Sequence, residues 1–175
     1  MTIELRPWHE WDATNYAYML NHVDFRYLED TYLEYRNIEA AKTHICQILY
    51  DEDVKGDLYR AVMVDGQLAG EVQVVSLEGV RSISASLGCL LMTEYTGRGV
   101  GYQACRQIIA MAFAKNGYER LSANVYSPNK ASIAMLEKLG FSREVTLRNG
   151  VRKDGNIYDV FLYVLLCRES DANLD

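Results

Sequence analysis

The sequence predicts an α/β protein with a mixed sheet of about seven strands, mostly antiparallel, with one parallel pair at its centre and about four flanking helices. The Asp-Gly dipeptide at residues 65–66 separates two apolar runs and indicates a hairpin, because it accepts the positive φ values of a tight two-residue turn. A later apolar run reaches a triple-glycine turn and passes into a helical pattern. The strand after that helix must run parallel to the strand before it, since the helix carries the chain back.

The first half of the chain is expected to supply a strand, two helices, a cap and a hairpin. Residues 2–6 alternate apolar and polar side chains and predict a short strand, and residues 7–20 predict a first helix. The segment from His22 to Arg36 is dense in tyrosine and acidic residues, and residues 37–50 have apolar side chains at helical spacing. Together the last two segments form a cap over whatever follows, and hairpin strands are expected next, at 58–64 and 68–76.

The second half is expected to alternate strands and helices. In order, these are a strand (82–92), a helix (102–116) that stops at Gly117, a strand (120–126), a helix that starts at Ser127-Pro128 and ends at Leu139, and two strands (142–147 and 158–166) that flank a loop with Asn149-Gly150 and Asp154-Gly155. Residues 1–167 are expected to form a single domain, and residues 168–175 an acidic, frayed tail. The apolar last strand could also pair across a homodimer.

Composition narrows the class of protein. The chain has 175 residues, of which 49% are hydrophobic and 24% charged, which is typical of one globular domain. The net charge of −6 and the lack of any Lys/Arg run argue against nucleic-acid binding. No apolar run has the length of a membrane span and the start does not resemble a signal peptide, so a cytoplasmic protein without membrane contact is expected. The four cysteines are scattered without Cys-x-x-Cys spacing, which argues against a metal site and a disulfide framework.

The triple-glycine turn carries the first functional prediction. Gly97, Gly99 and Gly101 let the backbone approach a ligand closely and turn successive N–H groups inward. The helix that follows adds free N–H groups and the positive end of its dipole. A phosphate or pyrophosphate is therefore the expected ligand.

Downstream motifs make a family resemblance specific. The segment from Asn124 to Ser132 leads into Glu-Lys-Leu-Gly-Phe at 137–141, and with the glycine turn this resembles the acyl-CoA-binding half of the GNAT superfamily of N-acetyltransferases. Asn-Lys-Ala-Ser at 129–132, Leu-Arg-Asn-Gly at 147–150 and the apolar run ending at Leu166 resemble the branch that acetylates ribosomal-protein N-termini, here called Rim-type. The match covers residues 58–167 and is looser before them.

This resemblance implies acetyl-CoA as co-substrate and a central parallel pair that splays apart. It implies that pantetheine lies along the backbone of the splayed strand at Leu90, Leu91 and Met92. It implies that pyrophosphate meets the glycine turn, whose residues are Thr96, Gly97, Arg98, Gly99, Val100, Gly101 and Tyr102. It also implies that the side chains of Asn129 and Ser132 face the cofactor from the other side. The family pattern Gln/Arg-x-x-Gly-x-Gly/Ala departs at Thr96. From the residues alone, Asn129 could instead cap a helix and Ser132 could lie inside one.

The implied reaction is direct attack of a primary amine through a tetrahedral intermediate, which needs a base, an oxyanion donor such as the N–H of Leu91 or Met92, and a proton for the thiolate. Leu136 stands where many family members have a tyrosine acid, so the Rim-type resemblance suggests Ser132 instead. Ser86 stands where relatives often have an acidic residue. The carboxylates left as candidate bases are Glu71, Asp154, Glu29 and Glu34, each of which could also be a solvated surface charge.

The acceptor and two rival functions stay open at this point. The resemblance favours a protein N-terminal α-amine, with Glu29, Tyr32 and Glu34 as acceptor-binding residues that attract an ammonium group by charge and cation–π contact. Polyamines, amino acids and antibiotic amines are compatible too, and so is a sensor that binds acyl-CoA without turnover. The run Gly99-x-Gly101-x-x-Ala104 also fits a dinucleotide fingerprint, but Glu119, which has the spacing of the required acidic residue, starts its strand instead of ending it.

Overall fold

The computed structural model describes residues 1–77 and 83–170, and these form one seven-stranded sheet with the order β1-β2-β3-β4-β5-β7-β6. The strands are β1 (Ile3–Pro7), β2 (Leu58–Val64), β3 (Gln67–Ser76), β4 (Ser84–Leu91), β5 (Arg120–Tyr126), β6 (Ser142–Lys153) and β7 (Asn156–Leu166). The pair β4–β5 is parallel and the other neighbours are antiparallel, which confirms the predicted fold class.

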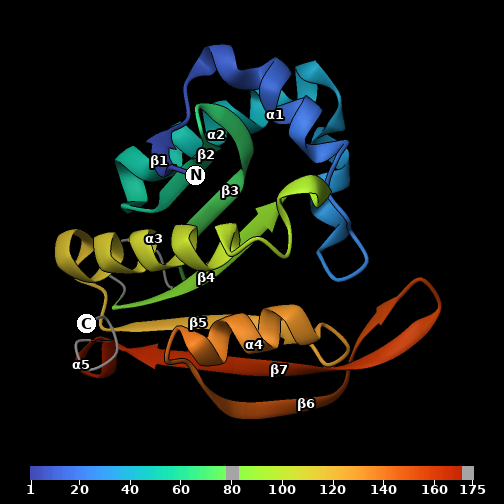
Figure 1. The fold of residues 1–175 in the computed structure, drawn as a ribbon, viewed down its shortest axis with the longest axis vertical. Helices are drawn as coiled ribbons and strands as arrows, with labels where there is room; N and C mark the ends of the chain where they lie inside the picture. The colour runs from blue at the N-terminus through green and yellow to red at the C-terminus, as the bar shows by residue number, and fades with distance from the viewer. Residues whose placement is uncertain (78–82, 171–175) are drawn as a thin grey trace.

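Helices cover the two faces of this sheet (Figure 1). They are α1 (Ala13–Leu20), α2 (Ile38–Lys55), α3 (Val100–Asn116), α4 (Lys130–Lys138) and α5 (Cys167–Ser170), with short 3-10 helices η1 (Glu10–Asp12), η2 (Asp30–Arg36) and η3 (Thr93–Tyr95). One buried core joins α3 and α4 to one face of the sheet, and a second joins α1, α2 and the segment before α2 to the other face. Within the described ranges, no helix has the length and apolar character needed to cross a membrane.

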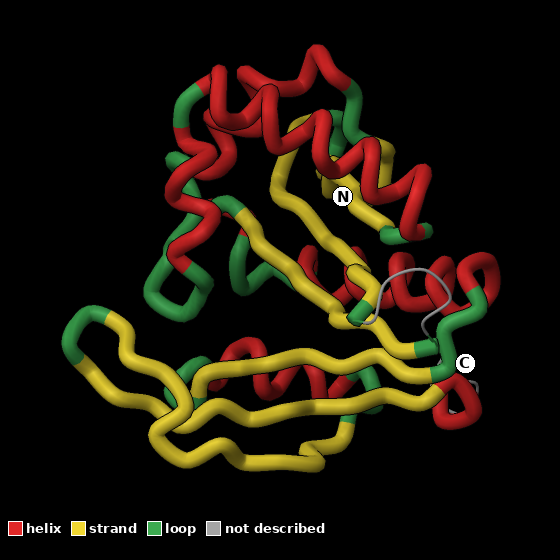
Figure 2. The backbone as a smooth tube through the Cα atoms, turned by 180° about the vertical axis from the view of Figure 1, so that it is seen from behind, coloured by secondary structure: helices red, strands yellow, loops and turns green. Residues whose placement is uncertain are grey.

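The two central strands, β4 and β5, are paired over a short stretch and then separate. Residues Ser84–Ser86 of β4 pair with Arg120–Ser122 of β5, and the ladder ends there. Beyond it β4 stays paired with β3 as far as Leu91, while β5 stays paired with β7 as far as Tyr126. Figure 2 shows the result, in which β1 to β4 lean away from β5, β7 and β6. The splayed pair implied by the family resemblance is therefore present.

Several local predictions hold because they rest on backbone geometry. Asp65 and Gly66 have φ values of 49° and 80°, as a tight hairpin turn requires. Gly117 ends α3 in the left-handed region with φ 69°, which satisfies the last carbonyls of the helix without steric cost. The strand expected at 120–126 has those bounds in the structure.

Other element bounds were predicted wrongly. The first α-helix begins at Ala13, well after residue 7, because Trp8 is fully buried and the Asp12 carboxylate is held by two hydrogen bonds from the Arg6 guanidinium. Ser127 does not cap α4; Asn129 does, and its side chain accepts a hydrogen bond from the backbone N–H of Ser132 at 3.2 Å.

The C-terminal hairpin is longer than expected. Asn149-Gly150 lies within β6 at an irregularity in the ladder, and only Asp154-Gly155 forms the turn to β7. β7 has β5 on one side and β6 on the other over residues 160–164, so this apolar part of the last strand has no free edge for pairing with a second copy. The expected tail starts inside α5, and residues 171–175 lie outside the described residues.

Candidate active site

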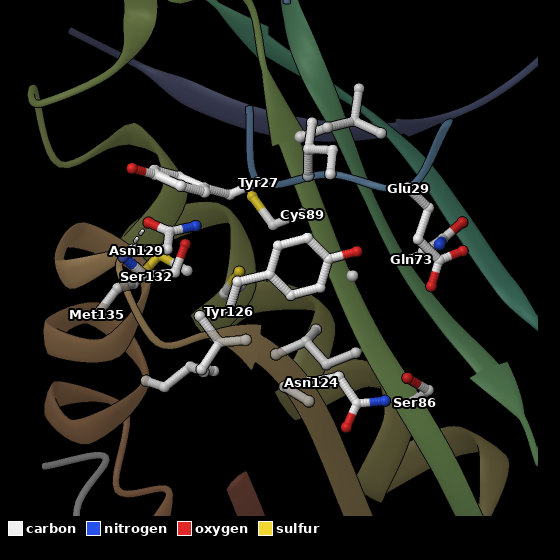
Figure 3. A pocket seen from close by; sticks show the side chains of 18 of the residues that line it. Tyr27, Glu29, Gln73, Ser86, Cys89, Asn124, Tyr126, Asn129, Ser132 and Met135 are labelled. Atoms are coloured by element: carbon white, nitrogen blue, oxygen red, sulfur yellow. Dashed lines mark hydrogen bonds between the residues drawn. The ribbon is translucent and has the colours of Figure 1, made fainter. Parts of the chain in front are cut away.

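A cavity of about 200 Å³ lies where β4 and β5 separate (Figure 3). On the side of α3 and α4 it is lined by Cys89, Cys105, Asn129, Ser132, Met135 and Leu136. On the side of the N-terminal segment it is lined by Tyr27, Leu28, Glu29, Tyr32 and Gln73, with Asn124 and Tyr126 from β5. Ser86, Leu87, Gly88 and Leu90 of β4 and Ala123 and Val125 of β5 complete the lining. The cavity therefore connects the two faces of the sheet through the gap between the strands.

The glycine turn lies outside the cavity lining and comes next to it at Gly101, beside Met135 and Cys89. Gly97 and Gly99 have φ values of 70° and 80°, and Gly99 is the N-cap of α3, so the first N–H groups of the helix have no partner within the helix. A Cβ on Gly101 would lie 3.2 Å from Met135 Sδ and 3.5 Å from Leu91 Cδ1. The glycine at 101 thus serves close approach between α3 and α4, whereas the other two serve the turn.

One further feature fits this cradle to the pyrophosphate of an acyl-CoA. Lys138 Nζ lies 4.4 Å from the centre of the Tyr102 ring, which puts a cation of α4 beside the first turn of α3. The Thr96 hydroxyl contributes little to binding a pyrophosphate, because it donates its proton to the carbonyl of Thr93 at 2.8 Å. Helix N–H groups and a nearby ammonium suit a diphosphate, so the residues present fit the cofactor that the resemblance implied.

The exposed edge of β4 has a defined polarity. The N–H of Met92 donates to Ala69 at 2.8 Å, and the carbonyl of Ser84 accepts from Leu77 at 3.1 Å, so the even-numbered residues of β4 direct their backbone groups toward β3. The odd-numbered residues Leu87, Cys89 and Leu91 direct theirs toward the gap. Leu91 therefore remains available as an oxyanion donor, whereas the prediction of Met92 for that role was wrong.

Asn129 and Ser132 lie together at the N-terminus of α4, and both line the cavity. The Asn129 side chain caps the helix, as the alternative interpretation allowed, and still faces the cavity. Ser132 is half-buried in the first turn of α4. Its backbone N–H donates to the cap, and its hydroxyl has no hydrogen-bond partner within the described part of the chain.

Comparison with known proteins agrees with this geometry. Residues 2–142 match the model of the acetyltransferase (GNAT) domain. The chain belongs to the GNAT family.

A curated relative named "Putative ribosomal N-acetyltransferase YdaF", from Bacillus subtilis (strain 168), is 32% identical over 108 residues, which are 62% of this chain and 58% of that protein. "Uncharacterized N-acetyltransferase p20" from Bacillus licheniformis is 32% identical over 85 residues, 49% of this chain and 48% of that protein, so the chain spans about half the length of these relatives.

Solved GNAT structures share the fold across nearly the whole chain. The ribosomal L7/L12 α-N-protein acetyltransferase RimL, in complex with coenzyme A, has a TM-score of 0.84 at 18% identity and covers 95% of this chain and 94% of its own. The ribosomal-protein-S5-alanine acetyltransferase of Vibrio fischeri has a TM-score of 0.85 at 20% identity, covering 95% and 93%. The microcin C7 self-immunity acetyltransferase MccE, in complex with acetyl-CoA and AMP, has a TM-score of 0.78 at 20% identity, covering 94% and 92%. The mostly antiparallel sheet of this chain excludes the dinucleotide-binding fold that Gly99-x-Gly101-x-x-Ala104 also suggested.

Among the candidate bases of this GNAT chain, Glu71 is the most deeply buried. It lies on β3 outside the cavity lining, and burial raises its carboxyl pKa to about 8, an effect that the nearby Trp8 and Tyr16 side chains only partly offset. The Tyr16 hydroxyl is 3.5 Å from Glu71 Oε1, whereas Oε2 and the Trp8 indole nitrogen have no hydrogen bond of acceptable geometry within the described ranges. Burial therefore favours the protonated form of Glu71, which packs behind the acceptor side of the site.

The remaining candidate carboxylates lie in different surroundings. Asp154 has φ 49° at the exposed tip of the β6–β7 hairpin, and Glu34 is exposed on η2; neither lines the cavity. Glu29 does line it. Tyr32 lines it too, and its hydroxyl accepts a hydrogen bond from Gln73 Nε2 at 2.8 Å, while burial raises the pKa of the phenol. Of the predicted catalytic and acceptor residues, the cavity thus brings together Ser132, Glu29 and Tyr32.

Sequence reasoning missed several lining residues, namely Gln73, Cys89, Asn124 and Tyr126. Asn124 and Tyr126 alternate with the buried Ala123 and Val125, so the period of two along β5 could have identified them as a row facing the other side. Gln73 reaches the site only because Gly88 on the neighbouring strand leaves room for its side chain: a Cβ at Gly88 would lie 2.9 Å from it. No local pattern in the sequence predicts this contact between Gln73 and Gly88, because the two residues lie on different strands.

Proposed function

We propose that this protein transfers the acetyl group of acetyl-CoA to a primary amine, and that the preferred amine is a protein N-terminal α-amine. The observation that carries the proposal is the cavity through the sheet. It has a hydroxyl and an amide from α4 on one side, and a carboxylate among tyrosines on the other. The two reactants would therefore enter from opposite faces and meet in the gap between β4 and β5.

On the cofactor side, the N–H groups from Arg98 to Tyr102 and the Lys138 ammonium would hold the diphosphate, and the edge of β4 would pair with the pantetheine arm. When bound, acetyl-CoA supplies a thioester carbonyl that a neutral amine can attack. The N–H of Leu91 would donate to the carbonyl oxygen, where negative charge develops. The Ser132 hydroxyl would donate a hydrogen bond to the sulfur and so assist its departure.

The acceptor side favours an amine that loses its proton easily. Its floor is neutral, with Gln73, Ser86 and Asn124, and Glu29 is the carboxylate in the cavity lining. A protein α-amine has a pKa near 8, so making it neutral at pH 7 costs about 1 kcal/mol, whereas a lysine-like or polyamine nitrogen costs about 4 to 5 kcal/mol. Glu29 can accept one proton from the amine at the acceptor mouth, directly or through water. A single carboxylate of this kind suits the α-amine, which is cheap to deprotonate, better than a lysine-like or polyamine nitrogen. The ribosomal N-acetyltransferase relative and the Rim-type fold neighbours support the same acceptor class.

A thiol-release assay with matched acceptors tests this proposal. One peptide is supplied with a free N-terminus, the same peptide is supplied with a blocked N-terminus and an internal lysine, and spermidine and single amino acids complete the set. We expect thiol release and one added acetyl group by mass spectrometry with the free N-terminus, and at least tenfold less with the blocked peptide, in line with the difference in amine pKa. Faster turnover of spermidine or of an amino acid would overturn the choice of acceptor. Acetyl-CoA binding without thiol release from any amine would establish the sensor function instead.

A further inference from the structure

Lys153 is a buried cation at the acceptor side whose contacts cross the molecule. It is the last residue of β6 and only 6% exposed, although lysine side chains are almost never buried without partners. Its ammonium donates to the carbonyl oxygen of Leu28 at 3.0 Å and pairs with the Asp30 carboxylate. These contacts join the C-terminal hairpin to the N-terminal segment that covers the first half of the sheet.

The segment that Lys153 holds is a wall of the cavity. Tyr27, Leu28 and Glu29 line the cavity in succession, so the anchored carbonyl and the anchored Asp30 flank Glu29 on both sides. A second contact supports the first, because the Tyr27 ring meets the Tyr158 ring of β7 edge-on, with centres 6.5 Å apart. Figures 1 and 2 both show the tip of the β6–β7 hairpin reaching toward this N-terminal segment.

Fold stability alone does not explain this arrangement. Removing an ammonium from water is costly, and a partner carboxylate returns most when it is buried too, yet the Asp30 side chain is 68% exposed. A long apolar side chain at position 153 would fill the same space without that cost. Unlike an apolar side chain, the ammonium fixes the positions of the Leu28 carbonyl and the Asp30 carboxylate, because it holds both at hydrogen-bonding distance.

We propose that Lys153 is a positioning residue for the acceptor, which holds the Tyr27–Asp30 wall against the β6–β7 hairpin and so sets the place of Glu29 and the width of the acceptor mouth. The wall packs on the half of the sheet that contains β4, and the hairpin belongs to the half that contains β5. The clasp of Lys153 with Leu28 and Asp30 therefore spans the same gap that the reactants occupy. This role rests on the proposed acetyltransferase function, and it leaves the acetyl-CoA cradle untouched.

The test uses Lys153→Met, Asp30→Asn and the control Arg152→Met, which removes an exposed charge from the same hairpin. With the peptide amine, Lys153→Met should raise KM about tenfold with kcat within about threefold, because the wall moves and the chemistry does not. Asp30→Asn should give a smaller rise, since Leu28 still accepts from Lys153, and Arg152→Met should give none. Acetyl-CoA affinity should be unchanged in all three.

Two additional measurements keep the inference falsifiable. In a Glu29→Gln background, Lys153→Met should raise KM by no more than about threefold, because the part of its effect that acts through Glu29 is already lost and only the change in the width of the mouth remains; a full tenfold rise would overturn the positioning role. Amide hydrogen exchange of residues 27–30 in the protein without reactants should be faster in Lys153→Met and in Asp30→Asn than in Arg152→Met. Unchanged exchange overturns the clasp, and this result does not depend on whether any amine is acetylated. Faster exchange together with no turnover in the wild-type protein would leave the clasp standing and remove the proposed function.

Discussion

The two sides of the cavity are built in different ways. The cofactor side is made of backbone groups and residues close in sequence, with the glycine turn, the first turn of α3 and the capped start of α4. The acceptor side is made of side chains from segments far apart, as the contacts of Tyr32 with Gln73 and of Lys153 with Leu28 illustrate. The difference indicates that the acetyl-CoA cradle is set by local rules, whereas acceptor specificity is set by tertiary contacts.

The largest expected effect concerns the carboxyl buried behind the acceptor side. The pKa of Glu71 is about 8 in the folded protein against an ordinary value of 4.5, so the folded state binds the proton more tightly and the free energy of unfolding falls as pH rises between these values. From pH 5.5 to 7.5 this group should cost about 2 to 3 kcal/mol. Glu71→Gln should remove that part of the slope in urea titrations at several pH values. Parallel profiles for the two proteins would show that Glu71 is not the protonated group.

The next effect tests the cofactor side. Gly101→Asp places a side chain near Met135 Sδ and a negative charge at the cradle, so the acetyl-CoA Kd should rise at least tenfold, or about 1.4 kcal/mol or more. Gly101→Asn, which has the same size without the charge, should lose less. Calorimetry on the folded variants measures both, and an unchanged Kd in Gly101→Asp would reject this binding site.

A third change separates chemistry from binding on the same side. Ser132→Ala removes the hydroxyl but keeps the backbone N–H that Asn129 caps, so α4 should keep its start. We expect kcat to fall about tenfold while the acetyl-CoA Kd stays within about threefold. If kcat does not change, Ser132 serves only packing in α4.

The smallest effect distinguishes two carboxylates of the acceptor side. Glu29→Gln should raise the KM of the peptide amine about threefold, because the charge that attracts the ammonium is partly screened by solvent. Glu34→Gln is the matched control, since Glu34 is exposed on η2 and does not line the cavity. Equal KM shifts in the two variants would mean that general surface charge, and not the cavity wall, attracts the amine.

The same contrast explains what the sequence could predict. The hairpin at Asp65-Gly66, the stop at Gly117 and the turn at Gly97 and Gly99 follow from backbone preferences of the residues themselves. The late start of α1 follows instead from burial of Trp8 against a distant part of the chain, which no local pattern reports.

The residues of the candidate site also fall into those that a local motif predicts and those that only tertiary contacts identify. The resemblance located Asn129 and Ser132, because their motif is contiguous with the start of α4. The sequence left Glu71 and Asp154 as equal candidates among the carboxylates near the expected acceptor mouth, and only the fold separates a buried carboxyl from one at a hairpin tip. Lys153 could not be identified at all, since its partners lie more than a hundred positions earlier in the chain.

Amide hydrogen exchange with and without acetyl-CoA tests the division between the two sides most directly. We predict that acetyl-CoA alone slows exchange at residues 87–91, 98–102 and 129–132, and leaves residues 27–30 and 153–158 unchanged until an acceptor amine is added. Protection that is absent from the glycine turn, or that appears mainly at residues 27–30 with acetyl-CoA alone, would contradict the account.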